Sequence, residues 1–369
     1  MNITIFIGGL SGGGAERVVC NLSNYLSERH NVEILTMSDD APAYQLNKNV
    51  SRVSLIKYGE TSNFIIKNFI RINRFRSYVK KSDADVYLAM LPGTINIILA
   101  HRKIINAPII ISERCDPQTR YESSKFQKWI MKNLYPKADG FVFQTKDAMN
   151  YYTEIIGGKG IVIPNAINQE FMREPFKGTR KKSIVAAGRL TEQKNFPLLI
   201  EAFSRITDKH PDYDLIIYGN GPQKNELVSL VKELGLGNKV KFPGYVNNFG
   251  DQIIDASLFV LSSNYEGMPN ALMEAMALGL PCISTDCPAG GPGFLINDGK
   301  NGLLVPVEDV VKLADAMDKV LSNEELSVEL GGNAREISSN LSSENIYYRW
   351  ESYIVEQVQK PYINLEKKI

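Results

Sequence analysis

Short apolar runs alternate with amphipathic stretches along the whole chain. An apolar run at residues 3–7 precedes a helical pattern at 16–26, and a second apolar run follows at 32–36. Further strand-like runs lie at residues 86–90, 109–112, 140–144 and 161–164, and then at 183–188, 214–218, 240–242, 258–261 and 281–284. This alternation is typical of parallel α/β domains, and its restart near residue 183 predicts two such domains in tandem.

A charged stretch of low hydrophobicity at residues 168–182 separates the two series and is typical of a linker. We therefore predict an N-terminal domain at residues 1–170 and a second domain at 171–345. The last segment, residues 346–369, begins as an amphipathic helix and ends in a polar tail. The apolar positions of this helix are Ile346, Trp350, Tyr353, Ile354 and Val358.

Composition excludes several classes of protein. The chain has 42 basic and 41 acidic residues, and this balance argues against a general affinity for nucleic acid. Its four cysteines, Cys20, Cys115, Cys282 and Cys287, lack the spacing of a zinc site or a disulfide framework. No basic region precedes the first apolar run, and no run reaches the roughly 18 apolar residues of a membrane span. We therefore expect a cytoplasmic protein.

A glycine-rich run at residues 8–14 follows the first strand and opens the first helix. Glycines let a ligand approach the backbone, and free N–H groups at a helix start favour anionic oxygens. A dinucleotide fingerprint would need a third glycine where Arg17 stands, so the run is a weak indication of NAD. A tight turn is the alternative, although the run has more glycines than a turn needs.

Two loops of the second half carry charged side chains where strands end. Arg189 and Lys194 follow the first strand of this half, at the edge where open α/β sheets bind ligands and where a diphosphate needs positive charge. Glu266 lies in a later loop, and Glu274 is expected near the first turn of the helix that begins at residues 269–270. Two carboxylates there could hold the hydroxyls of a sugar and a ribose. Solvated cations and carboxylates that complement a helix dipole are the alternatives.

In order and spacing, these motifs resemble the retaining glycosyltransferase family 4, which has the GT-B fold. Glu266 and Glu274 match its E-x7-E element, and Arg189 and Lys194 match its basic loop. The other matching segments are residues 13–16, 188–190, 219–222, 242–245, 262–269 and 301–306. The resemblance implies two Rossmann-like domains facing across a cleft, with the C-terminal helix crossing back to the first domain.

The resemblance also implies an activity. The enzyme would move a hexose or N-acetylhexosamine, with retention of configuration, from a nucleoside diphosphate sugar, with UDP the expected nucleotide. The implied acceptor is a polyprenyl-diphosphate-linked glycan of bacterial surface polysaccharide assembly. No cofactor and no metal are expected, because two fixed cations stand where a metal would neutralise the diphosphate.

By the same resemblance, the second domain holds most of the donor site. Arg189 and Lys194 would neutralise the diphosphate and assist its departure, Glu266 would hold the donor sugar, and Glu274 would hold the ribose. The other donor-binding residues would be Gly13, Gly14, Gly188, Gly219, Gly221, Tyr245, Gly267, Met268, Pro269 and Asn270. The acceptor-side candidates are Glu16, Glu113 and Arg114.

Two positions depart from the family pattern. Relatives place a histidine in the loop after the strand at 109–112, where this chain has Glu113 and Arg114. Relatives often carry a glutamate in the segment at 290–295, where this chain has none. The first departure leaves open whether Arg114 replaces the histidine, and the second leaves the identity of the donor open.

Two other classes of function are considered. A catalytically silent scaffold that binds sugar nucleotides would not need the complete charged set, and a GT-B epimerase would need different acid and base groups. Asp83 and Asp85 match the metal-binding D-x-D pattern but precede a strand, at the edge of the sheet that does not bind ligands. The three histidines, His30, His101 and His210, are too dispersed for a hydrolase triad or a metal site.

Residues 63–81 combine basic and apolar side chains and include no acidic residue. The basic members are Lys67, Arg71, Arg74, Arg76, Lys80 and Lys81, and a second basic stretch surrounds Trp129. A basic amphipathic helix can lie on an anionic bilayer, so peripheral contact with the inner face of the cell membrane is one interpretation. A helix that packs on the sheet with its cations in solvent is the other.

Overall fold

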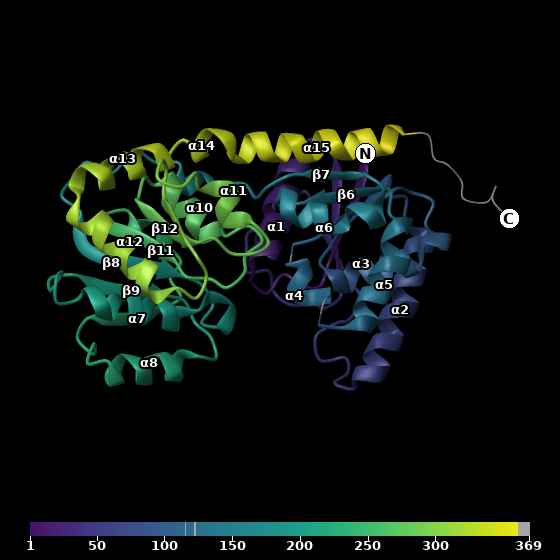
Figure 1. Cartoon of the computed structure of the whole chain (residues 1–369). Helices are drawn as coiled ribbons and strands as arrows, with labels where there is room; N and C mark the ends of the chain where they lie inside the picture. Colours follow the sequence, from purple (N-terminus) through teal and green to yellow (C-terminus); the bar gives the residue numbers. More distant parts are fainter. Residues whose placement is uncertain (115, 122, 361–369) are drawn as a thin grey trace. The chain divides into compact units, whose positions relative to one another are not determined.

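The computed structural model describes residues 1–114, 116–121 and 123–360, and the chain divides into two compact units (Figure 1). Unit 1 contains residues 1–164 together with the C-terminal segment from Glu344, and unit 2 contains residues 165–343. Each unit is built on one parallel sheet, as the alternating pattern predicts.

The sheet of unit 1 has seven described strands in the order β3-β2-β1-β4-β5-β6-β7, all parallel. The strands are β1 (Asn2–Ile7), β2 (Asn31–Thr36), β3 (Val50–Ser54), β4 (Val86–Met90), β5 (Ile109–Ser112), β6 (Gly140–Phe143) and β7 (Gly160–Val162). Strands β4, β5 and β6 are buried along their full length, which explains their continuous apolar sequences. The edge strand β3 is only half-buried along most of its length, and three of its five residues are polar, so the apolar pattern did not predict it.

Helices cover both faces of this sheet. They are α1 (Gly14–Leu26), α2 (Phe64–Lys81), α3 (Pro92–Ala100), α4 (Pro117–Tyr121), α5 (Lys125–Leu134), α6 (Lys146–Ile156) and α15 (Ser343–Gln359), with 3-10 turns η1 (Arg102–Ile104) and η2 (Tyr135–Lys137). The connections through α2, α3, α5 and α6 run from β3 towards β7, and the connection through α1 runs the opposite way. Because parallel crossovers are right-handed, α2, α3, α5 and α6 share one face and α1 lies on the other.

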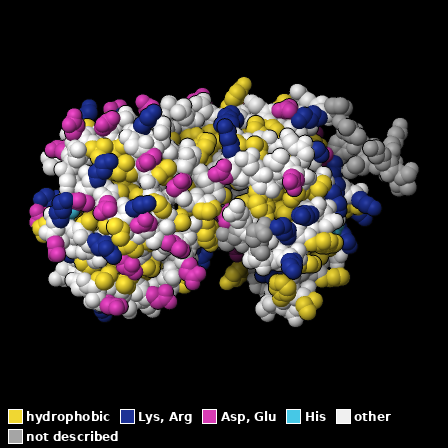
Figure 2. Space-filling view, viewed as in Figure 1, with side chains coloured by type: hydrophobic (Ala, Val, Ile, Leu, Met, Phe, Trp, Pro, Cys, Tyr) yellow, Lys and Arg dark blue, Asp and Glu magenta, His cyan; other side chains and the backbone are white. Residues whose placement is uncertain are grey.

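Helix α2 packs on this sheet only through its C-terminal half. Phe75 and Val79 are its buried residues, and the Phe75 ring stacks on Phe6 of β1 with 5.2 Å between centroids. Hydrophobic and basic side chains gather on the surface over α2 and α5, at the lower right of Figure 2. Within the described residues, no helix is long and apolar enough to cross a membrane.

The C-terminal helix α15 returns to unit 1, as the fold class predicts. Its Trp350 is fully buried, and Glu351 accepts hydrogen bonds from Arg29 at 2.9 Å and pairs with His30 at 2.9 Å. The hydroxyl of Tyr353 accepts from the backbone N–H of Phe141 at 3.0 Å. This helix is therefore a structural part of the first unit.

The sheet of unit 2 has six described strands in the order β10-β9-β8-β11-β12-β13. The strands are β8 (Lys181–Ala187), β9 (Asp214–Tyr218), β10 (Val240–Gly244), β11 (Ala256–Leu261), β12 (Cys282–Thr285) and β13 (Leu303–Val305). The helices are α7 (Phe196–Ile206), α8 (Lys224–Glu233), α9 (Phe249–Ile253), α10 (Asn270–Ala277), α11 (Gly291–Leu295), α12 (Val310–Ser322), α13 (Glu324–Ala334) and α14 (Ile337–Asn340), with 3-10 turns η3 (Gln169–Phe171) and η4 (Glu192–Lys194). The short strand β13 was not predicted, because three residues carry too little periodicity.

The prediction of a linker at residues 168–182 is wrong for most of that stretch. Phe171 is 3% exposed and contacts the ring of Phe249, while Arg173 pairs with Asp251. The guanidinium of Arg180 donates to the carbonyls of Ile254, Ala256 and Gly279 at 2.8–3.1 Å. The charged residues of this segment are typical of a solvent-exposed linker, but in the structure Arg173 and Arg180 bind the segment to the rest of unit 2.

Candidate active site

Two loops of unit 2 meet at the carboxyl edge of its sheet. One follows β8 and contains η4, and the other joins β11 to α10. The backbone N–H of Asn264 donates to the carbonyl of Gln193 at 2.8 Å, and the side chain of Asn195 donates to that of Asn264 at 2.8 Å. The hydroxyl of Ser262 donates to the carbonyl of Lys194 at 2.9 Å. These bonds fix the two predicted motifs against each other.

Lys194 and Glu266 form an ion pair between these loops. The Lys194 Nζ lies 2.5 Å from the Glu266 Oε1, and the two side chains are only 15% and 8% exposed. The same Oε1 accepts a hydrogen bond from Ser263 at 2.7 Å, and Thr285 donates to the Ser263 carbonyl at 2.6 Å. Two side chains predicted to contact different parts of the donor are therefore in direct contact.

The backbone around Glu266 is held by the segment that follows β12. The N–H of Glu266 donates to the carbonyl of Pro288 at 2.5 Å, and the N–H of Ala289 donates to the carbonyl of Glu266 at 3.0 Å. A Cβ atom on Gly291 would lie 2.0 Å from the carbonyl oxygen of Gly267. This contact explains why position 291, in the segment where relatives often carry a glutamate, has no side chain here.

Three predicted donor-binding glycines have packing roles that are visible within unit 2. A Cβ on Gly219 would lie 2.0 Å from the Gly188 carbonyl oxygen, and a Cβ on Gly221 would lie 2.3 Å from the Leu190 carbonyl oxygen. A Cβ on Gly188 would lie 2.7 Å from the Cε of Lys194, whose side chain crosses it. The absence of side chains here lets the loops after β8 and β9 touch and lets Lys194 reach Glu266.

The other predicted side chains of unit 2 differ in exposure. Arg189 is exposed, and no residue in the described part of the chain forms an ion pair with it. Tyr245 is 69% exposed. Glu274 is buried near the first turn of α10, which begins at Asn270 as predicted. Asn270 accepts a hydrogen bond from Asn165 at 2.7 Å.

The segment around α10 supplies the rest of the predicted donor set. Met268 is buried and Pro269 caps the start of α10, while Gly267 is half-buried beside Gly291. The thiol of Cys287 is buried nearby, and this burial, with the charge of Glu266, raises its pKa to about 12. A thiol in this setting is protonated at neutral pH and is not a nucleophile.

In unit 1, the glycine-rich run forms the turn that precedes α1. Gly13 is the N-cap of α1 with extended backbone, and Gly14 is the first helical residue. Glu16 folds back so that its carboxylate accepts from the N–H of Gly12 at 2.5 Å. The carboxylate of Glu16 therefore has a partner within the loop itself.

Glu113 and Arg114 follow β5, where Glu113 is buried and Arg114 is half-buried. The carboxylate of Glu113 accepts hydrogen bonds from the hydroxyls of Tyr121 and Tyr135, and burial raises its pKa. The guanidinium of Arg114 lies 5.6 Å from the ring of Trp350, and burial lowers its pKa to about 10. Both residues thus contribute to packing.

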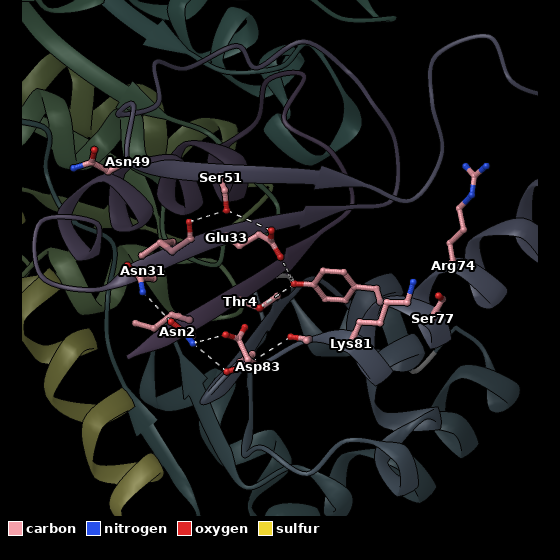
Figure 3. Close-up of a pocket in the computed structure, with 15 residues that line it drawn as sticks. Asn2, Thr4, Asn31, Glu33, Asn49, Ser51, Arg74, Ser77, Lys81 and Asp83 are labelled. Atoms are coloured by element: carbon pink, nitrogen blue, oxygen red, sulfur yellow. Dashed lines mark hydrogen bonds between the residues drawn. The ribbon is translucent and has the colours of Figure 1, made fainter.

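A pocket of about 690 Å³ lies at the opposite, amino edge of the unit 1 sheet (Figure 3). Its lining includes Asp83, the first residue of the D-x-D pattern, whose carboxylate accepts from the Asn2 side chain at 3.0 Å. The carboxylate of Asp85 accepts from the Asn2 backbone at 2.8 Å. The structure therefore places Asp83 and Asp85 at the start of β1, where they hold the N-terminal residues in position.

Sequence reasoning missed Ser263 and Thr285 as members of the site. Ser263 lies within a matching motif, but nothing in its sequence context distinguishes it from Ser262. Thr285 ends a strand that is buried along its full length, so it resembles a core residue. Ser263 lies in the same loop as Glu266, and only the fold brings the Thr285 hydroxyl to that loop.

Comparison with known proteins identifies the family. The family model for glycosyl transferases group 1 matches residues 168–337, and that for glycosyltransferase family 4 matches residues 12–171. The chain is 28% identical over 361 residues, covering 96% of it and 99% of the relative, to the Campylobacter jejuni GalNAc-α-(1→4)-GalNAc-α-(1→3)-diNAcBac-PP-undecaprenol α-1,4-N-acetyl-D-galactosaminyltransferase. It is 31% identical to an uncharacterized glycosyltransferase of Methanocaldococcus jannaschii, covering 68% of this chain and 72% of that one.

The fold matches as well. The Anabaena protein HepE, in complex with UDP and glucose, superposes with a TM-score of 0.82 at 16% identity, covering 96% of this chain and all of HepE. The two Rossmann-like units define a protein of the GT-B fold class. The chain belongs to glycosyltransferase family 4 and is a glycosyltransferase.

Proposed function

We propose that this enzyme transfers a hexose or N-acetylhexosamine from a UDP-sugar, with retention of configuration, to a polyprenyl-diphosphate-linked glycan. The observation that carries the proposal is the Lys194–Glu266 ion pair at the carboxyl edge of the unit 2 sheet. The loop that contains Lys194 also contains the exposed Arg189. The Campylobacter relative, whose name specifies an undecaprenol-linked acceptor, supports the choice of acceptor. HepE, which binds UDP, supports the choice of nucleotide.

The ion pair is compatible with a role in binding the diphosphate. A lysine ammonium has three N–H donors, so Lys194 can keep its bond to Glu266 and still donate to a diphosphate oxygen. Arg189 is exposed beside it and offers a guanidinium that binds phosphate oxygens in a bidentate manner. Charge placed where the leaving group develops its negative charge typically accelerates a reaction about 10²–10³-fold.

The remaining proposed roles are those that the family resemblance implies. Glu266 orients Lys194 and would contact the donor sugar with its second carboxylate oxygen. Glu274 would hold the ribose hydroxyls, and the turn at Gly13 and Gly14 would meet the diphosphate. Glu16, Glu113 and Arg114 remain acceptor-side candidates, of which Glu113 would act from a buried position in unit 1 and Arg114 from a half-buried one.

Donor and acceptor can be tested together. Wild-type enzyme is incubated with a panel of UDP- and GDP-sugars, first alone to detect slow hydrolysis and then with a polyprenyl-diphosphate-linked glycan. We expect one UDP-sugar to be consumed, and NMR of the product to show the anomeric configuration of the donor. Preference for a GDP-sugar would refute the nucleotide, and an inverted product would refute retention.

We also propose that transfer needs no metal, because Arg189 and Lys194 supply the positive charge. Activity should survive dialysis against a chelator. Loss of transfer that manganese or magnesium restores would refute this proposal.

Because the proposed acceptor is linked to a lipid, the proposal includes contact between the enzyme and the inner face of the cell membrane. The segment at residues 63–81, which forms helix α2, is the proposed contact. Vesicle sedimentation tests it, and a protein that stays in the supernatant with anionic vesicles would refute it.

A further inference from the structure

Helix α2 is longer than the sheet that it covers. Its 18 residues extend roughly 27 Å, and only Phe75 and Val79, in the second half, are buried. In the first half, Phe64 is 75% exposed, Ile65 78% and Phe69 67%. At 100° per residue, these three side chains fall on the same arc of about 140° as the two buried ones. The apolar stripe that packs on the sheet in the second half of α2 therefore continues along the first half, where no described residue covers it.

Helix α5 presents a second exposed apolar pair on the same face of the sheet. Phe126 is 69% exposed and Trp129 is 61% exposed, and their rings stack with 6.4 Å between centroids. Helix α5 packs on α3, and the end of α3 contacts α2 through the Phe75 and His101 rings. The two exposed apolar groups thus belong to one layer of helices, where hydrophobic and basic side chains gather in Figure 2.

The charges within these two segments are of one sign. Ten of the 42 basic residues and none of the 41 acidic ones lie in residues 64–81 and 125–137, so the rest of the chain has 32 basic and 41 acidic residues. Positive charge concentrated around exposed aromatic and aliphatic side chains complements an anionic bilayer, where the apolar groups enter the lipid and the cations meet the headgroups.

Several of these cations are already bound within the protein. Arg71 donates to the carbonyl of Met37 at 3.1 Å, and Arg74 pairs with Glu60 at 2.5 Å. Arg76 donates to His101 at 3.1 Å. The three lysines of α2 have no side-chain partner in the described residues, but the arginines are not free to follow lipid headgroups.

We infer that the protein docks on the bilayer by inserting the apolar side chains of α2 and α5, with electrostatic attraction in a secondary role. This inference rests on the membrane contact proposed above. It adds that α2 and α5 contact the lipid chains as well as the headgroups. It predicts that binding persists at high salt, because burial of apolar surface is not screened.

The test compares three variants on vesicles of phosphatidylcholine with a minority of phosphatidylglycerol. The apolar variant combines Phe64→Ser, Ile65→Ser and Phe69→Ser, and should lower the partition coefficient more than about 100-fold at every salt concentration. The charge variant, with glutamine replacing Lys67, Lys80 and Lys81, should weaken binding only at low salt. A matched control replaces exposed apolar residues elsewhere with serine and should bind like the wild type. Its positions are Val311, Val328 and Tyr348.

Tryptophan fluorescence gives a second reading of insertion. The chain has two tryptophans, and Trp350 is fully buried, so quenching by brominated lipid should report Trp129. The quenching should disappear in the Trp129→Phe variant.

Three results would overturn the inference. The first is loss of wild-type vesicle binding at about 1 M salt, where the Debye length is about 3 Å. The second is Trp129 fluorescence that brominated lipid does not quench. The third is a wild-type dimer in solution that the apolar substitutions dissociate. The last result would assign the surface to a second copy of this chain. Vesicle binding is measured without donor or acceptor, and donor hydrolysis of the apolar variant is measured separately, so failure of the proposed reaction would be recognised as such.

Discussion

Replacing Lys194 should reduce both the rate and the stability of the enzyme, whereas replacing Arg189 should reduce the rate alone. Lys194 is bonded to a buried carboxylate, and Arg189 is exposed without an ion-pair partner in the described residues. Lys194→Met keeps the hydrocarbon chain that crosses Gly188 and removes only the charge. The matched comparison is Arg189→Met.

The size of the effect follows from the burial of the pair. Removing one partner of a fully buried ion pair costs about 3–5 kcal/mol. Here Lys194 is 15% exposed and Ser263 still donates to Glu266, so water and one hydrogen bond would soften the loss. We expect a cost of about 1–3 kcal/mol, which lowers the Tm of a unit of this size by about 2–10 °C. Both variants should lose about 10²–10³ in kcat.

A double-mutant cycle measures the pair directly. Thermal melts are recorded for Lys194→Met, Glu266→Gln and the combined variant, together with donor turnover. The combined variant should recover most of the lost stability, because neither charge is then left unpaired. If Lys194→Met melts like the wild type, or if the two single effects simply add, the ion pair does not hold these loops together.

Three further outcomes can be checked. Ser263→Ala should lower kcat about tenfold with an unchanged donor KM, because it removes one of the hydrogen bonds that position the Glu266 carboxylate. A change in KM alone would contradict this. Glu274→Ala should chiefly raise the donor KM in steady-state kinetics, whereas Glu266→Gln should chiefly lower kcat, and identical profiles would contradict the separate roles. Hydrogen bonds from Lys209 and His210 lower the pKa of Asp318 to about 2, so its stabilisation, about 1–2 kcal/mol, is present above about pH 4 and lost as the pH falls towards 2. The stability difference between wild type and Asp318→Asn in urea titrations should shrink over that range, and a constant difference would contradict it.

The sequence predicted the fold best where strands are buried on both faces. The runs at residues 86–90 and 109–112 coincide with β4 and β5, because a central parallel strand is buried along its whole length and is therefore mostly apolar. The half-buried edge strand β3 escapes this requirement and was missed for that reason, whereas β13 was missed because it has only three residues. The linker prediction for residues 168–182 was wrong because charged residues were taken as a sign of exposure to solvent. In the structure, Arg180 of this stretch binds carbonyl groups of the protein.

For the candidate site, the sequence indicated which residues matter but not how they meet. The spacing of Glu266 and Glu274 carries the family resemblance, yet it does not reveal that Glu266 is bonded to Lys194, 72 residues away. The contact depends on the absence of a side chain at Gly188, on the bonds between two loops, and on Thr285 behind Ser263. These are tertiary facts, and no local pattern contains them.

Helix α2 illustrates the same limit at the surface. Its sequence predicts one apolar stripe and a basic remainder, and two interpretations of that pattern were open: packing on the sheet, or contact with a bilayer. The structure separates the stripe into a half that packs, with Phe75 and Val79, and a half that is exposed, with Phe64 and Ile65. Burying an exposed aromatic or branched aliphatic side chain is worth about 1.5–3 kcal/mol, comparable to two or three cations near an anionic surface. The exposed half therefore has as strong a physical reason to meet lipid as the charges do, so the salt dependence of vesicle binding is the measurement that distinguishes apolar insertion from electrostatic attraction.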